Sequence, residues 1–441
     1  MKICLLKPNR HSRFQINPPL GLGCIASSTD SKHVIEIFDA QLENLSPVEA
    51  AKKIHLKINP NVIGIQVYTG DHHWVRKFIE WYKSLYSEKT KIICGGFHVT
   101  ALGEIAIKYL NCDYGIMGNG MPSWHNLINE IDSDNEIKER LITSYSNKFV
   151  NPYYEKMNID RYFAHLHGAN IPLKGKRPLV FMATRGCPFS CNFCASHIVH
   201  GRIVKRESYF ITAKRIQDLI AKYDIDEIIF ADDNLIYDKD WAKKLFKFMI
   251  KMKLNIHWKA PGGIRADIMD EELSELMAES GCYYVGLGIE SGSKRMLKLM
   301  NKNLNLDQVE GTVNILKINE IKTSGFFILG YPGENDEDIE KSIRFSLEVP
   351  FDRIQVSKFI PYPGSKIFDI LYSKYSMMDY QEDDFNTIYD NVHYEMYYGK
   401  WIRKFYLRLK IIKLMLKDFN YNQLKTIIKH PQIKEVIKWN F

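Results

Sequence analysis

Short apolar segments alternate with longer amphipathic segments along most of the chain, and Gly, Pro or Asp bounds most of them. Apolar runs separated by segments of helix length are typical of parallel strands joined by helices. The first group of predicted strands consists of Lys2–Leu6, Val34–Asp39, Val62–Tyr68, Lys91–Gly96 and Tyr114–Gly118. The pattern therefore predicts an α/β fold that begins with a doubly wound domain at residues 1–130.

A second group of predicted strands follows residues 131–176, a polar and then tyrosine-rich segment without clear periodicity, which we interpret as a linker. This group consists of Leu179–Gly186, Glu227–Asp233, His257–Arg265, Tyr283–Ser291, Thr323–Glu334 and Arg353–Ser365. Six strand–helix units predict a partial (β/α)6 barrel over residues 177–370, two units short of the full barrel. Residues 371–441 show no further alternation, so we expect a helical C-terminal extension there.

Composition narrows the class of protein. Of the 441 residues, 45% are hydrophobic and 25% are charged, which is ordinary for a globular protein. The N-terminus lacks the apolar run of a signal peptide, and no segment is long and apolar enough to span a bilayer, so we expect a cytoplasmic protein. Most of the net charge of +8 lies between Lys400 and Asp418, and no nucleic-acid motif accompanies it. We therefore expect no nucleic acid as a partner.

Three of the eight cysteines share one short loop directly after a predicted strand: Cys187, Cys191 and Cys194. Cysteines usually supply all four ligands of a 4Fe-4S cluster, so a loop with three cysteines leaves one iron free for a substrate or cofactor. The alternative is a zinc knuckle that borrows His197 or His200, although zinc sites favour ligand pairs from two separated segments. The spacing therefore favours an iron–sulfur cluster.

This CxxxCxxC loop, with an aromatic residue before its last cysteine, resembles the radical S-adenosylmethionine (SAM) superfamily, and the resemblance covers residues 177–370. It implies that the open iron chelates the methionine part of SAM, and that the reduced cluster cleaves SAM to methionine and a 5'-deoxyadenosyl radical. It also implies SAM contacts at Phe193, Asp232, Asp233, Asn234, Arg265, Glu290, Ser291, Gly330 and Pro361. Taken singly, these residues also fit simpler roles as caps, turns or, for Arg265, a salt bridge.

Glycine-rich ends of the first group of strands resemble the flavodoxin-like cobalamin-binding domain that precedes the barrel in cobalamin-dependent radical SAM enzymes. The matching residues are Leu20, Gly21, Asp39, Tyr68, Thr69, Gly95, Gly96, His98, Gly118, Asn119 and Gly120. The DxHxxG motif that supplies a histidine to cobalt is absent, so we expect cobalt without that histidine, beside the loop Lys7–Phe14. In addition, Gly118-Asn119-Gly120-Met121 stands where relatives commonly have Gly-Glu-Gly-Glu. The alternative is a domain that kept this fold and lost its ligand.

The resemblance implies an enzyme that uses a 4Fe-4S cluster, SAM and cobalamin, most simply a class B methyltransferase acting on a poorly nucleophilic atom. Cyclisation, ring contraction or oxidative rearrangement, as in anaerobic magnesium-protoporphyrin ester cyclases, is the alternative. A carrier of the cluster or of cobalamin without catalysis is a further one. We expect a reducing partner such as flavodoxin or ferredoxin, and a small-molecule, lipid or tetrapyrrole-like substrate.

The C-terminal segment Lys400–Phe419 has apolar residues at helical spacing and basic residues elsewhere around the helix. Such a helix either docks on the barrel with its basic face in water or lies on an anionic membrane surface. The sequence leaves both interpretations open.

Overall fold

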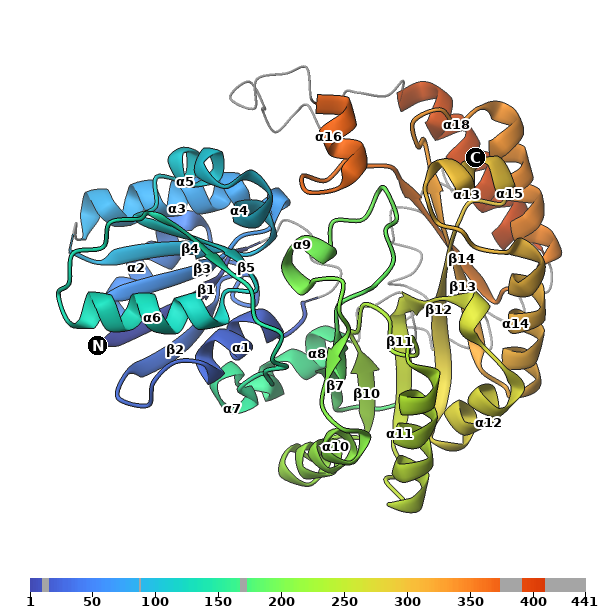
Figure 1. Ribbon diagram of the computed structural model, residues 1–441, viewed down its shortest axis with the longest axis horizontal. Helices are drawn as coiled ribbons and strands as arrows, with labels where there is room; N and C mark the ends of the chain where they lie inside the picture. Colours follow the sequence, from blue (N-terminus) through green and yellow to red (C-terminus); the bar gives the residue numbers. More distant parts are fainter. Residues whose placement is uncertain (10–15, 87–88, 167–172, 373–390, 409–441) are drawn as a thin grey trace.

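The computed structural model describes residues 1–9, 16–86, 89–166, 173–372 and 391–408. Two six-stranded parallel sheets, each flanked by helices, lie side by side, the first at the left of Figure 1 and the second at the right. The α/β class predicted from the sequence is confirmed.

The first sheet has the strand order β2-β1-β3-β4-β5-β6. Its strands are β1 (Lys2–Lys7), β2 (Val34–Asp39), β3 (Val62–Gln66), β4 (Lys91–Gly95), β5 (Tyr114–Gly118) and β6 (Leu141–Ser144). Its helices are α1 (Leu20–Ser27), α2 (Pro47–Lys57), α3 (His72–Leu85), α4 (Phe97–Leu102), α5 (Glu104–Leu110) and α6 (Met121–Asp132). The strand order reverses between β1 and β3, and in a doubly wound sheet a ligand binds at that point, beyond the carboxyl ends of the strands.

Strand β6 lies inside the segment that the sequence predicted as a linker, and it pairs with β5 in parallel. It is a short edge strand whose Leu141 and Ile142 are only half-buried. An edge strand of this kind carries no continuous apolar run, which is why the hydrophobic pattern did not predict it.

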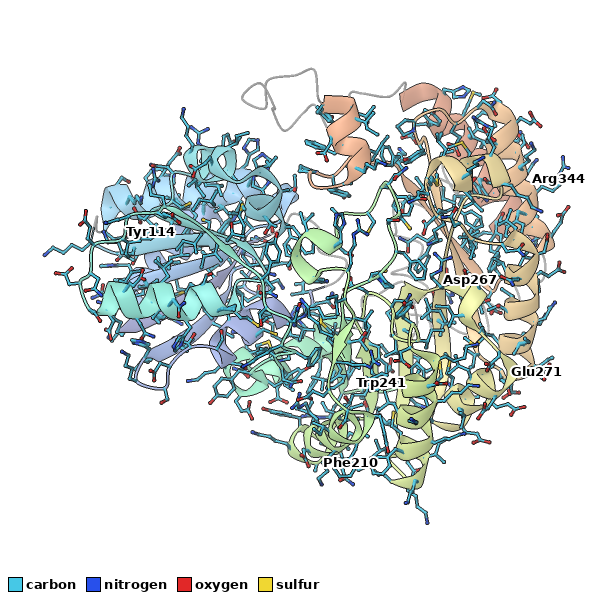
Figure 2. The ribbon with its side chains drawn as sticks, viewed as in Figure 1. Tyr114, Phe210, Trp241, Asp267, Glu271 and Arg344 are labelled. Carbon is cyan, nitrogen blue, oxygen red and sulfur yellow. The ribbon has the colours of Figure 1, made fainter. Side chains whose placement is uncertain are left out.

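The second sheet has the order β14-β13-β12-β11-β10-β7 and forms the predicted partial barrel. Its strands are β7 (Pro178–Phe181), β10 (Glu227–Phe230), β11 (His257–Ile264), β12 (Cys282–Glu290), β13 (Lys322–Leu329) and β14 (Arg353–Lys358). Its helices are α10 (Tyr209–Tyr223), α11 (Lys239–Lys251), α12 (Glu271–Glu279), α13 (Lys294–Leu299), α14 (Leu306–Ile318) and α15 (Asp336–Glu348). In Figure 2, Arg344 marks the exposed side of α15, and the buried Trp241 marks the side of α11 that packs on the barrel.

The strand predicted at Leu179–Gly186 is divided. After β7 the chain turns, and β8 (Thr184–Arg185) pairs antiparallel with β9 (Lys205–Arg206). The cysteine loop and the short helix α9 (His197–His200) lie between β8 and β9. This hairpin therefore projects the loop from the barrel towards the first sheet.

Residues after β6 join the two sheets. The helices α7 (Tyr154–Met157) and α8 (Phe163–Leu166) flank a 3-10 turn. The Tyr162 hydroxyl donates to Asp39 (2.7 Å) at the end of β2, and the Tyr154 hydroxyl donates to the Val180 carbonyl (3.1 Å) on β7. Both tyrosines are buried, so these bonds fix the position of the barrel relative to the first sheet.

The described C-terminal helices are α16 (Lys366–Tyr372) and α18 (Asn391–Tyr406). Trp401 and Phe405 of α18 are fully buried, and Trp401 Nε1 donates to Ser346 Oγ of α15 (2.8 Å). The described part of the predicted amphipathic segment therefore docks on the barrel, and its part beyond residue 408 lies outside the described residues. None of the described helices is long and apolar enough to cross a membrane.

Candidate active site

The cysteine loop begins with a turn that only glycine can make. Gly186 follows β8 with φ +105°, and a Cβ there would lie 2.4 Å from the Ile203 carbonyl oxygen. Directly after it, the Cys187 N–H donates to the Gly201 carbonyl (3.2 Å). The two ends of the β8–β9 hairpin thus hold the first cysteine in place.

The far end of the loop is held by the segment that follows α13. The Asn192 N–H donates to the Met300 carbonyl (2.9 Å), and Asn301 Nδ2 donates to the Ser190 carbonyl (2.8 Å). The ring of Phe193 packs against an apolar cluster that includes Met296 and Tyr331. The three loop cysteines are half-buried, whereas the other five cysteines are buried.

The arrangement of donors fits a cluster better than a single metal ion. Among the described residues, no three His, Cys, Asp or Glu side chains are grouped to hold one ion. His200, a possible zinc ligand, instead places Nδ1 2.7 Å from Asp233 Oδ2. Because a 4Fe-4S cluster binds each cysteine through a different iron, its thiolates need not converge on one point. Burial raises the pKa of the Cys187 and Cys191 thiols, so binding of iron displaces protons.

The two acidic residues after β10 hold the hairpin. Asp232 is buried and accepts hydrogen bonds from the Ala183 N–H (3.2 Å) and from Thr184 Oγ1 (2.8 Å), and burial raises its pKa to about 7. Asp233 accepts from the Gly186 N–H (2.9 Å). Burial pushes the pKa of Asp233 upward, but the hydrogen bond and charge of His200 outweigh it and leave that pKa lowered.

Asn234 is the residue of this acidic segment that keeps an open acceptor. Its side chain is 2% exposed, and its Oδ1 has no hydrogen-bond partner among the described residues. A buried carbonyl oxygen without a donor is unfavourable, and a ligand ammonium would satisfy it.

An ion pair lies next to the cysteine loop. Glu290, the last residue of β12, has φ +70°, and its Oε1 lies 2.9 Å from Lys302 Nζ. Burial lowers the pKa of Lys302, but the charges of Glu290 and Cys191 outweigh it, so the net pKa is raised. Lys302 therefore places positive charge beside Cys191. Sequence reasoning did not select Lys302, since it belongs to no motif.

The remaining predicted SAM residues have partners within the protein. Arg265 makes a two-pronged ion pair with Asp267 (2.8 and 2.5 Å) and stacks over Phe189 (3.9 Å to the ring centre). Ser291 Oγ lies 3.0 Å from Ser342 Oγ of α15. The structure thus shows the salt-bridge role for Arg265 and places Ser291 in contact with α15.

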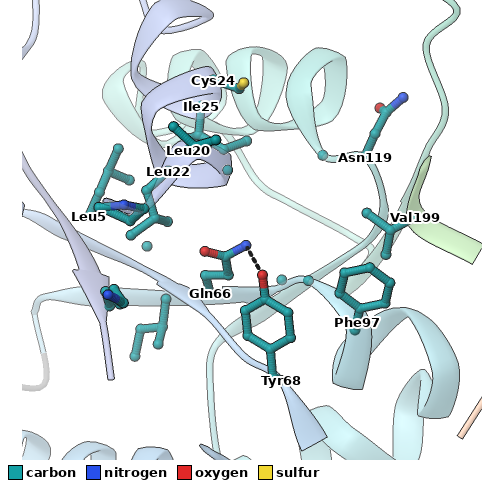
Figure 3. Close-up of a pocket in the computed structure, with 18 of the residues that line it drawn as sticks. Leu5, Leu20, Leu22, Cys24, Ile25, Gln66, Tyr68, Phe97, Asn119 and Val199 are labelled. Atoms are coloured by element: carbon teal, nitrogen blue, oxygen red, sulfur yellow. Dashed lines mark hydrogen bonds between the residues drawn. The ribbon is translucent and has the colours of Figure 1, made fainter. Parts of the chain in front are cut away.

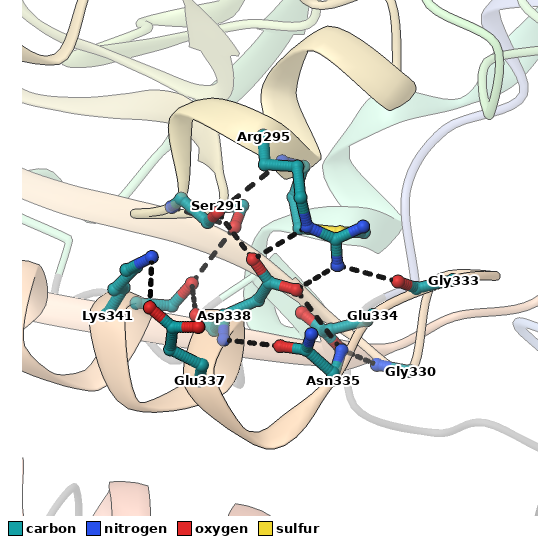
Figure 4. Close-up of polar contacts among 12 residues, drawn as sticks. Ser291, Arg295, Gly330, Gly333, Glu334, Asn335, Glu337, Asp338 and Lys341 are labelled. Carbon is teal, nitrogen blue, oxygen red and sulfur yellow. Dashed lines mark hydrogen bonds and ion pairs between the residues drawn. The ribbon is translucent and has the colours of Figure 1, made fainter.

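Ser291 belongs to a polar network beside the loop after β13 (Figure 4). Within it, Arg295 pairs with Asp338 and donates to the Gly333 carbonyl (2.7 Å). Gly330 has φ +86° and its N–H donates to Glu334 Oε2 (2.6 Å). Burial raises the pKa of Glu334 to about 7. These contacts shape the loop over the barrel mouth, where Pro361 is also buried.

A cavity of about 450 Å³ lies between the carboxyl edge of the first sheet and the barrel. Of the residues predicted to bind cobalamin, those lining it are Leu20, Gly21, Tyr68, Gly95, Gly96, Gly118, Asn119 and Gly120. The other three do not line it. Asp39 pairs with Lys7 (2.9 Å), the Thr69 carbonyl accepts from His72 Nδ1, and His98 stacks on His72 (5.1 Å). Burial lowers the pKa of His98 to about 3.

Glycines in the cavity lining let other lining side chains pack close to the backbone. A Cβ at Gly64 would lie 2.6 Å from Trp124 Cη2, and one at Gly21 would lie 2.6 Å from Gln66 Nε2. Figure 3 shows Leu20, Leu22 and Ile25 of α1 on one side of this slot and Gln66 on the other. The slot suits a flat or nucleotide-like group. Sequence reasoning did not select Gln66 or Trp124, because a lone polar or aromatic residue gives no signal.

The cavity and the cysteine loop share a wall. On the barrel side the lining residues are Val180, Met182, Arg185, Val199, His200 and Ala231. Within this wall, His200 contacts Asp233, and Asp233 accepts from the N–H of Gly186, which precedes Cys187. The side chains of His200 and Asp233 therefore connect the cavity to the start of the cysteine loop.

Comparison with known proteins identifies one domain: residues 182–346 match the radical SAM superfamily, so this part of the chain is a radical SAM domain. An uncharacterised methyltransferase of Pyrococcus horikoshii is 28% identical over 93% of this chain and 94% of its own length. The cytidylyl-2-hydroxyethylphosphonate methyltransferase of Streptomyces wedmorensis is 26% identical over 83% and 80%.

Among solved structures, the radical SAM methyltransferase TsrM of Kitasatospora setae, with cobalamin and a [4Fe-4S] cluster bound, has a TM-score of 0.70. The match covers 85% of this chain and 75% of that chain at 14% identity, so it shows a shared fold. The shared fold includes the doubly wound domain that precedes the partial barrel, since the match covers 85% of this chain.

Proposed function

We propose that this protein is a cobalamin-dependent radical SAM methyltransferase. In this proposal residues 1–130 bind cobalamin, residues 131–176 form the linker, residues 177–370 bind the cluster and SAM, and residues 371–441 form the helical extension. The single observation that carries the proposal is the wall shared by the cavity and the cysteine loop. It supports the proposal because methyl transfer requires the two cofactors to face one substrate.

The residues present fit each of the three groups. Cys187, Cys191 and Cys194 would hold the cluster, and the open Oδ1 of Asn234 would accept from the SAM ammonium. The slot beside Gly64 would hold cobalamin. When bound, the cluster and SAM supply a radical that removes a hydrogen atom, and cobalamin supplies the methyl group.

The protein's own contribution is to position these groups and to exclude water. Asp232 and Asp233 fix the hairpin, and the apolar cluster around Phe193 covers the loop. Such a site takes a small-molecule substrate and needs an electron donor. We propose flavodoxin or ferredoxin as that donor.

The test is anaerobic reconstitution, followed by incubation with reductant, cobalamin and methyl-labelled SAM. We expect about four iron and four sulfide per chain, bound cobalamin, and 5'-deoxyadenosine as a product of SAM cleavage. Replacing all three loop cysteines by Ala should abolish iron binding and SAM cleavage. Stoichiometric zinc without iron would refute the proposal, and a product that carries no labelled methyl group would favour cyclisation or rearrangement.

A further inference from the structure

The barrel side of the cavity contains an arginine, Arg185, that forms no ion pair with a carboxylate among the described residues. Arg185 is 7% exposed and lines the cavity at the end of β8. Its hydrogen bonds within the described residues go to two sulfur atoms: Nη2 donates to Cys24 Sγ (3.0 Å), and Nε donates to Met182 Sδ (3.4 Å). Thiol and thioether sulfurs are weak acceptors. Arg185 is therefore a permanent positive charge whose donors are poorly satisfied by the protein.

A second buried cation lies opposite. Lys205 pairs with Arg185 across the β8–β9 hairpin and is 8% exposed. Burial, and then the charge of Arg185, lowers the pKa of Lys205. In the described part of the chain, neither side chain has a carboxylate within the 4.0 Å of an ion pair. Like charges directly opposite each other in a hairpin are destabilising. An anion bound between Arg185 and Lys205 would relieve this repulsion, and the described part of the protein supplies none.

The carboxylate of Asp233 responds to the charge of Arg185, but it already has other partners. The charge of Arg185 helps to lower the pKa of Asp233, but that carboxylate accepts from Gly186 and contacts His200. The missing anion is therefore expected in the cavity, which Arg185 faces.

The position of Arg185 indicates which anion this is. Its partner Cys24 belongs to α1, and Gly21 and Ile25 of the same helix line the slot between α1 and Gln66 (Figure 3). A flat group buried in that slot must be joined to the rest of its molecule near the mouth, where the barrel contributes Arg185. In cobalamin the joining group is a phosphodiester, and a guanidinium binds such a group through two parallel hydrogen bonds.

We propose that Arg185 binds the phosphodiester of the cobalamin tail and that Lys205 adds a second positive charge behind it. This inference rests on the proposed function, in which cobalamin fills the cavity.

The test compares two corrinoids by equilibrium titration, followed by the corrin absorbance spectrum. Hydroxocobalamin carries the phosphodiester tail, and diaquacobinamide lacks it. The reconstituted full chain is titrated as wild type, Arg185→Gln, Arg185→Lys and Arg206→Gln. Arg206 lies on the same hairpin but outside the cavity lining and is paired with Asp238, so its variant controls for loss of one positive charge.

We expect Arg185→Gln to weaken cobalamin binding by about 10- to 100-fold, the usual effect of losing a charged hydrogen bond, and to change cobinamide binding by less than about twofold. Arg185→Lys should recover part of the affinity, and Arg206→Gln should match wild type. Unchanged thermal unfolding and iron content would show that the variants are folded.

Three results would overturn the inference. Equal losses for both corrinoids would assign Arg185 to the corrin ring or to the fold. Unchanged corrinoid affinity with lower iron content would assign its charge to the cluster, and unchanged affinity with unchanged iron would leave a substrate carboxylate or phosphate as the anion. If wild type binds neither corrinoid, the proposed function fails first, and the inference fails with it.

Discussion

Replacing Gly186 by Ala should release the first cysteine while both sheets stay folded. The residue has φ +105°, and the new Cβ would meet the Ile203 carbonyl oxygen at 2.4 Å and the Gly201 carbonyl oxygen at 3.2 Å. These are backbone atoms, so no side-chain rotation relieves the contact. The strained φ costs about 1–3 kcal/mol. Movement of the turn also breaks the hydrogen bonds of Gly186 to Asp233 and of Cys187 to Gly201, at about 1 kcal/mol each.

A matched control lies at the other end of the same loop. Gly201 also has positive φ (+82°), but the nearest atom to a Cβ there is the flexible Lys205 Nζ at 3.5 Å. Gly201→Ala therefore carries the backbone strain without the collision, and should cost about 1–2 kcal/mol. The difference between the two variants isolates the effect of the collision.

The assay is iron content per chain after anaerobic reconstitution, with circular dichroism to follow the sheets. Gly186→Ala should lose most of its iron and keep its dichroism spectrum, whereas Gly201→Ala should keep most of both. Equal iron retention by the two variants would refute the argument that this turn positions Cys187. Loss of the dichroism spectrum would show that the turn supports the barrel as well.

Three further predictions concern other parts of the molecule. Lys259 is buried 3.5 Å from Glu227, and burial lowers its pKa to about 8. Folding favours the neutral form of Lys259, so stability is lost as the pH falls through about 8. The melting temperature should therefore rise from pH 7 to 9.5 more in wild type than in Lys259→Met. Trp401→Ala should cost about 3–5 kcal/mol in thermal unfolding, and Trp401→Phe clearly less, because Trp401 is fully buried against α15. Asp233→Asn should speed the loss of iron to a chelator, and an unchanged rate would contradict the role of Asp233 in holding the loop.

Most of the fold could be predicted because parallel strands buried on both faces leave continuous apolar runs. Residues Ile3 to Leu6 of β1 are all fully buried, and the predicted segment matches the strand closely. The predictions ran too far where a strand ends in glycine and proline. Thr323–Glu334 extends beyond Leu329, because the chain turns out of the sheet at Gly330, which has positive φ.

The site was less predictable, because a motif indicates where a residue lies in the fold but not which groups it contacts. An acidic segment after β10 was predicted to receive an ammonium, yet Asp232 and Asp233 are satisfied by N–H and O–H donors of the hairpin. Those donors come from a segment about fifty residues earlier in the chain, so no local pattern reports them. Lys302 was also not predicted, since nothing in the sequence marks its ion pair with Glu290.

The contacts of Asp233 also limit how far the two cofactor sites can be treated as independent. One carboxylate oxygen contacts His200 in the cavity wall and the N–H of Gly186 at the start of the cysteine loop. A change on either side therefore alters the hydrogen bonding available to the other, and residues that share a partner show non-additive effects. Strand β8 is only two residues long, so the hairpin has little length over which a shift could be absorbed. Binding in the cavity and retention of the cluster should accordingly be linked through this one side chain.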